Sequence, residues 1–204
     1  MTSLETYLKQ MRQERPVAVR KTSYYGALAN LCNAVGETLK PKIRYVITPQ
    51  GRGAGIPDGG LYAATQLRRN VDASPETTLP ERGCVEVKGL REDILKVAES
   101  EQVGRYLERY GLVLVTNYRD FLLVGRVEGG GRVNLERYTL AASEAEFWQR
   151  AEHARETDAE HGERFTEYLR RVMLHAAPLS RPEDVARFLA SYAMSLAFGI
   201  SLLQ

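Results

Sequence analysis

Three short segments contain residues whose types and spacing could do chemistry: IPDGG at residues 56–60, VEVKG at 85–89 and QVGRY at 102–106. Asp58 lies beside two glycines, where backbone and ligands can approach closely. Glu86 and Lys88 are two residues apart in a segment expected to be a strand, so they point to the same face. The valines that alternate with them point to the other face, which we expect to be core.

These residues suit phosphodiester hydrolysis. Two carboxylates, from Asp58 and Glu86, and the backbone carbonyl of Val87 are oxygen ligands of the kind that Mg²⁺ prefers. A bound Mg²⁺ lowers the pKa of water and offsets charge on a phosphate. Lys88 could orient or deprotonate the attacking water and stabilise the developing charge. Gln102 and Tyr106 are four apart and share one helix face, from which they could contact the phosphate or support Lys88.

The elements that must position these residues alternate between helices and strands. Thr2 and Glu5 form a capping box that opens a short helix, and residues 22–36 have the apolar spacing of an amphipathic helix. The pattern then predicts strands at residues 43–48, 61–65 and 84–87, one helix over 91–110, two strands around 118–119, a further strand near 133–140, and only helices from 143 to 204. This order predicts an α/β fold.

Composition allows this function without demonstrating it. The chain has 204 residues, 44% of them hydrophobic, and its net charge is only +2, so nucleic-acid binding requires clustered charge. Cys32 and Cys84 lie apart in apolar runs, which predicts buried free thiols, a reducing compartment and a cytoplasmic location. No run of about 18 apolar residues is present, so we expect no membrane-spanning segment.

The order of PD, ExK and QxxxY resembles the PD-(D/E)xK nuclease superfamily. A wider similarity covers roughly residues 20–126, in the runs KTSYYGALANLCNAVGETLKP, GAGIPDGGLY, GCVEVKG and QVGRYLERYGLVLVTNYRDFLLV. These runs look like the N-terminal endonuclease domain of restriction–modification polypeptides in which an N6-adenine DNA methyltransferase follows the nuclease.

The resemblance implies a restriction-endonuclease-like mixed β-sheet core flanked by helices, with an all-helical C-terminal tail. It also implies cleavage of double-stranded DNA with Mg²⁺, for which Mn²⁺ could substitute. By motif match, Asp58 and Glu86 are metal ligands, Lys88 is the catalytic lysine, and Gln102 and Tyr106 form an accessory motif. We expect the nuclease core to occupy residues 1–140 and a helical tail or linker to occupy 141–204.

Two features depart from the family pattern. Many members have a further acidic residue on the first core helix, and here Glu37 is the only candidate for this additional metal ligand. The chain also has neither an Asn-Pro-Pro-aromatic motif nor a glycine-rich methyl-donor loop. We therefore expect the methyltransferase or recognition domain to lie elsewhere, in a longer polypeptide or a separate subunit.

Alternatives remain open at this stage. A PDG sequence is a common turn, and ExK on a strand is often a solvated face. The chain could be a non-catalytic DNA-binding or scaffolding domain that keeps the nuclease fold. It could also be a stand-alone repair or recombination nuclease. The joint order and placement of the three motifs favours the restriction-type nuclease.

Overall fold

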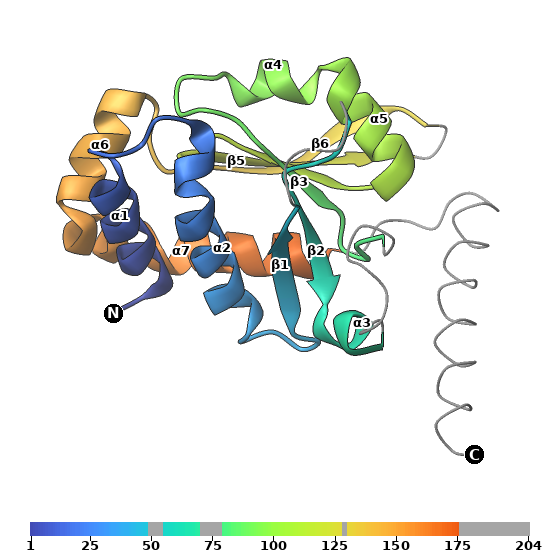
Figure 1. Ribbon diagram of the computed structural model, residues 1–204, viewed down its shortest axis with the longest axis horizontal. Helices are drawn as coiled ribbons and strands as arrows, with labels where there is room; N and C mark the ends of the chain where they lie inside the picture. The colour runs from blue at the N-terminus through green and yellow to red at the C-terminus, as the bar shows by residue number, and fades with distance from the viewer. Residues whose placement is uncertain (49–54, 70–78, 128–129, 176–204) are drawn as a thin grey trace.

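A six-stranded mixed sheet forms the centre of the protein in a computed structural model, which describes residues 1–48, 55–69, 79–127 and 130–175 (Figure 1). Its strands follow chain order: β1 (Ile43–Ile47), β2 (Gly59–Ala63), β3 (Cys84–Val87), β4 (Val113–Thr116), β5 (Asp120–Arg126) and β6 (Arg132–Thr139). Neighbouring strands are antiparallel except β3 and β4, which run parallel. The expected mixed α/β fold is confirmed.

Helices account for most of the remaining described chain. They are α1 (Ser3–Glu14), the 3₁₀ helix η1 (Lys21–Tyr24), α2 (Tyr25–Gly36), α3 (Ala64–Arg69), α4 (Ile94–Ala98), α5 (Glu101–Tyr110), α6 (Glu144–Glu152) and α7 (Ala154–Leu174). The Thr2 hydroxyl accepts the backbone N–H of Glu5 at 3.2 Å, so the predicted cap of α1 is present. Within the described ranges, no helix combines the length and apolar character needed to span a bilayer.

Helices cover both faces of the sheet. On one face, α1, α2, α6 and α7 contribute to a large apolar cluster that includes Val85 and Val87 of β3. On the other, α4 and α5 pack over a smaller cluster that includes Cys84. Figure 1 shows α4 and α5 above the sheet and α7 below it. The core-facing valines of β3 agree with the sequence pattern, but the opposite face of β3 is also covered.

The described part of the expected C-terminal tail is helical and belongs to the main core. Helix α7 packs against α1 and α2, and α6 packs against α1. Phe147, Phe165 and Tyr168 from these two helices are fully buried in the cluster that also contains Leu4 and Leu8 of α1. Residues 141–175 therefore complete the core that the N-terminal helices begin. The remainder of the predicted helical tail, residues 176–204, lies outside the described residues.

The segment predicted as one helix over 91–110 consists of two. The Asp93 side chain accepts the N–H of Leu95 at 2.9 Å and starts α4, and the Ser100 hydroxyl accepts the N–H of Val103 at 3.3 Å and starts α5. Each side chain satisfies a backbone donor that a helix start leaves unpaired. The buried positions step by four from Ile94 to Ala98 and then by five to Val103, so the helical spacing shifts where Ser100 starts the second helix.

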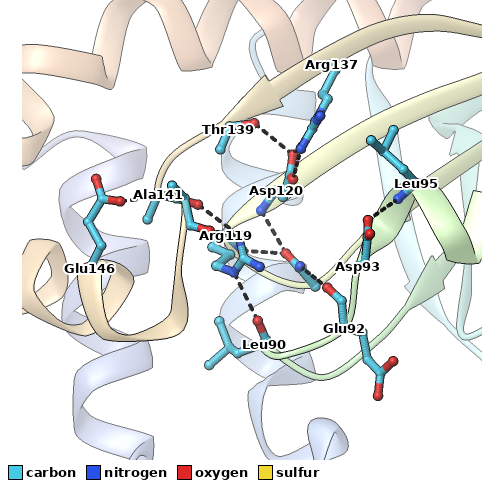
Figure 2. Close-up of polar contacts among 12 residues, drawn as sticks. Leu90, Glu92, Asp93, Leu95, Arg119, Asp120, Arg137, Thr139, Ala141 and Glu146 are labelled. Carbon is cyan, nitrogen blue, oxygen red and sulfur yellow. Dashed lines mark hydrogen bonds and ion pairs between the residues drawn. The ribbon is translucent and has the colours of Figure 1, made fainter.

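The turn between β4 and β5 organises the loops at one end of the sheet (Figure 2). The Asn117 side chain accepts the N–H of Asp120 at 2.9 Å and donates to the carbonyl of Glu92 at 2.7 Å. Tyr118 has a positive φ of 74°, a conformation that costs free energy for a residue with a Cβ. Buried Asp120 accepts two hydrogen bonds from Arg137 of β6, at 3.0 and 2.5 Å.

Arg119 links three segments through backbone carbonyls. Its guanidinium donates to Leu90 at 3.0 Å, Ala141 at 2.9 Å and Ala142 at 3.1 Å (Figure 2). Leu90 follows Lys88 closely in the chain, so Arg119 fixes the segment that leaves β3. The same side chain ties this segment to the connection between β6 and α6.

We predict that Arg119→Met lowers the free energy of unfolding by about 2 kcal/mol, because partly buried carbonyls lose their donors. Urea unfolding followed by far-UV circular dichroism measures the change. Arg105→Met is the matched control, since Arg105 lies on the surface of α5 and its nearest carboxylate, on Glu101, is 98% exposed and 4.0 Å away. The control should change stability by less than about 0.5 kcal/mol. Equal effects of the two substitutions would contradict the linking role of Arg119.

Candidate functional site

The site begins where β2 and β3 separate. These strands are paired only at Gly59–Val85 and Gly60–Cys84, and Asp58 directly precedes the first pair. Beyond it, the N–H of Val87 donates to Asp58 Oδ2 at 2.8 Å. A carboxylate thus replaces the next residue of the backbone ladder. The PD turn brings Asp58 to β3, as the motif order predicted.

The carbonyl of Val87 and the carboxylate of Asp58 converge on one cation. Lys21 of η1 places Nζ 3.0 and 2.8 Å from the two carboxylate oxygens of Asp58 and 2.6 Å from Val87 O. The Tyr25 hydroxyl also donates to Asp58 Oδ1. Neither Lys21 nor Tyr25 was predicted from the sequence as a site residue. The 3₁₀ helix η1 therefore contributes an ammonium group to the site, and the first residue of α2 contributes a hydroxyl.

Glu86 of β3 forms an ion pair with Lys88, the first residue after this strand. Lys88 Nζ lies 2.7 Å from Glu86 Oε1, so the two side chains share a face as predicted. The Glu86 side chain is only 2% exposed and that of Lys88 is 28% exposed, which leaves the ammonium reachable from solvent. Burial raises the pKa of Glu86, the Lys88 hydrogen bond opposes this rise, and the charge of Asp58 adds to it. The structure thus holds the Glu86 carboxyl group at a position where ionisation is costly.

Gln102 and Tyr106 of α5 contact each other. Gln102 Nε2 donates to the Tyr106 hydroxyl at 2.8 Å, and this bond fixes the direction of a buried phenol. Burial raises the pKa of Tyr106 to about 12, with small additions from the charges of Glu86 and Asp58. Tyr106 therefore stays protonated at neutral pH, within electrostatic range of both carboxylates. The predicted same-face placement of the pair on a helix is present.

Glu37 does not reach this site. It follows the last residue of α2, where it pairs with Lys42 and Arg44 at 2.8 Å each. Tyr25 lies at the opposite end of α2, and twelve helical residues span about 18 Å. The interpretation of Glu37 as a further metal ligand is therefore corrected: helix geometry places it at the wrong end, and two cations occupy its carboxylate.

A tyrosine ring explains one glycine of the PDGG turn. A Cβ added to Gly59 would lie 2.5 Å from the ring of Tyr45 on β1, so that ring can cover the strand start only if residue 59 has no side chain. The buried Tyr45 hydroxyl has no hydrogen-bond partner in the described part of the chain. Burial raises the pKa of Tyr45 well above its ordinary value, and the charges of Asp58 and Glu86 contribute to the rise.

The donor set fits a hard divalent cation. Among the described residues, no group of three or more His, Cys, Asp and Glu side chains could hold a metal, so such an ion would depend on mixed ligands. Asp58 and Glu86 offer carboxylates and Val87 a carbonyl, which are oxygen donors suited to Mg²⁺ with water as the remaining ligands. In the structure, the Lys21 ammonium lies between the Asp58 carboxylate and the Val87 carbonyl, so these oxygens already accept a positively charged group.

Comparisons with known proteins are sparse. No family model matches the chain, and no curated protein matches it. A solved structure described as "cryoEM structure DrdV-DNA complex" is similar over 86% of this chain, with 14% sequence identity and a TM-score of 0.47. This chain spans 14% of the length of that one. The assignment of a function therefore depends on the geometry of the site.

Buried Glu86 gives a prediction about stability and pH. Because burial raises the pKa of Glu86 in the folded protein, the fold is more stable with Glu86 protonated than with it ionised. This stabilisation is complete below the ordinary carboxyl pKa of about 4.3 and is lost as pH rises through the folded pKa. Glu86→Gln cannot ionise. Without divalent cations, we expect its Tm to exceed that of the unsubstituted chain by a few degrees at pH 7, and the gap to close towards pH 4.

Differential scanning calorimetry at several pH values measures this gap. Glu108→Gln, on the exposed side of α5, is the control and should leave Tm unchanged at every pH. A lower Tm for Glu86→Gln at pH 7 would show that the ion pair with Lys88 outweighs the cost of burial.

Proposed function

We propose that the chain is a Mg²⁺-dependent DNA endonuclease domain that hydrolyses phosphodiester bonds of double-stranded DNA. The supporting observation is the convergence of the Asp58 carboxylate and the Val87 carbonyl on one cation position, beside the Glu86–Lys88 pair. Neither feature alone would define a function, because aspartates are common in turns and lysine–glutamate ion pairs are common in proteins. Their combination on diverging strands supports phosphoryl chemistry.

Each residue has a role in this proposal. Asp58, Glu86 and the Val87 carbonyl would hold the cation, which supplies charge neutralisation and a lowered water pKa. Lys88, partly exposed and anchored by Glu86, would orient the attacking water and donate to the phosphate oxygen on which charge develops. The Gln102–Tyr106 pair would border the phosphate from α5 and retain its phenolic proton at neutral pH.

We further propose that this nuclease works within a restriction–modification system. The sequence resemblance to methyltransferase-fused nucleases supports this context. No base-reading element was recognised in the sequence, so site selection would come from a methyltransferase or recognition domain in the full-length protein or a separate subunit. The alternative of a stand-alone nuclease predicts cleavage that does not depend on such a partner.

Plasmid nicking tests the nuclease. We predict that the chain converts supercoiled plasmid to nicked and linear forms with Mg²⁺ or Mn²⁺ and that EDTA stops the reaction. Lys88→Ala should reduce the rate by at least about 100-fold, the usual cost of losing one transition-state donor. Lys42→Ala is the matched control, because Lys42 also pairs with a glutamate at 2.8 Å but lies directly before β1, and its partner Glu37 follows the end of α2.

Two results would count against the proposal. Equal rates for Lys88→Ala and the unsubstituted chain would remove Lys88 from the chemistry. An inactive chain that still shifts duplex DNA in a gel would favour the non-catalytic binding domain considered above. Activity gained only on adding a methyltransferase partner would support the restriction–modification context.

A further inference from the structure

Lys21 is held at the site through its backbone. Its carbonyl accepts a hydrogen bond from the Tyr118 hydroxyl, and Tyr118 is buried at the strained turn between β4 and β5. The ring of Tyr24 packs edge-on against Tyr118, with centroids 5.4 Å apart, which further fixes η1 against this turn. The backbone position of Lys21 is thus set by the same turn that arranges the loops after β3.

The Lys21 side chain is less constrained than its backbone. It is 29% exposed, whereas that of Asp58 is 12% exposed, so the ammonium lies at the solvent side of the pair. A four-carbon stem lets the ammonium swing out without moving η1. Its three oxygen contacts are to the atoms of Asp58 and Val87 that the proposed function assigns to a divalent cation.

We propose that Lys21 is an internal competitor for the cation position, an inference that rests on the proposed nuclease function. Without a divalent cation, the ammonium neutralises Asp58 and satisfies the Val87 carbonyl. An ammonium and a divalent cation repel each other and cannot share these oxygens, so cation binding displaces Lys21 towards solvent. The displaced Lys21 ammonium then lies where the site opens to solvent and can form an ion pair with a phosphate of a DNA substrate.

This competition raises the apparent Kd for the cation, which equals the intrinsic Kd divided by the fraction of molecules in which Lys21 has left the site. Removing the ammonium removes that penalty. We expect Lys21→Met to bind Mn²⁺ about 10-fold more tightly than the unsubstituted chain in the absence of DNA. Lys21→Arg keeps a cation and should stay within about 2-fold of the unsubstituted chain.

The measurement is the free Mn²⁺ signal in electron paramagnetic resonance, titrated without DNA. Lys42→Met is the control for loss of a lysine paired with a carboxylate, and it should not change affinity. Asp58→Asn should lose the binding. Lys21→Gln serves as a second neutral variant, and far-UV circular dichroism establishes that each protein is folded.

A structural readout separates displacement from simple charge removal. In a chain labelled with ¹³C-lysine, the Lys21 ε-methylene resonance is identified by its absence from Lys21→Arg. We expect saturating Mg²⁺ to move this resonance to the position of solvated lysines. An unmoved resonance, with Mg²⁺ bound, would overturn the proposal.

The outcomes are distinguishable from failure of the nuclease proposal. Unchanged or weaker Mn²⁺ binding by both neutral Lys21 variants would overturn the competitor role while leaving an Asp58-dependent cation site in place. Absence of Asp58-dependent binding in every variant would overturn both proposals. Tighter binding by both neutral variants, with the ε-methylene shift, would support the competitor role whatever the nicking rate.

Discussion

The site depends on one backbone constraint: Val87 lies at the point where β3 has lost its antiparallel neighbour. A buried N–H and C=O cannot remain unpaired without a cost of about 1–3 kcal/mol each. Asp58 accepts the N–H and Lys21 donates to the C=O, so a carboxylate and an ammonium meet at the strand. Because the pairing of β2 with β3 ends after two residues, the backbone N–H and C=O of Val87 take these side chains as hydrogen-bond partners.

The rest of the fold makes this arrangement sustainable. β3 lies within the sheet, with apolar clusters on both faces, so its backbone has little freedom to close the gap. The same burial makes ionisation of Glu86 costly in free energy, whereas the Lys88 side chain remains partly exposed to solvent. Natural proteins accept such local costs where a preorganised site needs them. The large helical face, which α6 and α7 complete, supplies compensating burial.

Local patterns made much of this structure predictable. Alternation in VEVKG placed Glu86 and Lys88 on one face, and capping residues located the start of α1. Lys21 could not be found this way, because its contact with Asp58 spans 37 positions and depends on how η1 meets the sheet. Glu37 was misjudged for the same reason: its charge is visible in the sequence, but which end of α2 lies beside Asp58 is not. The break between α4 and α5 was signalled by Asp93 and Ser100, whose side chains cap the starts of these two helices.

The central claim is that Asp58, Glu86 and Val87 form one cation site, and anomalous diffraction from crystals soaked in Mn²⁺ tests it most directly. We expect a manganese peak at ligand distance from the Asp58 carboxylate and the Val87 carbonyl, on the side of Glu86, with the Lys21 ammonium moved away. A peak elsewhere, or a fully ordered Lys21 still bridging Asp58 and Val87 at saturating Mn²⁺, would contradict it.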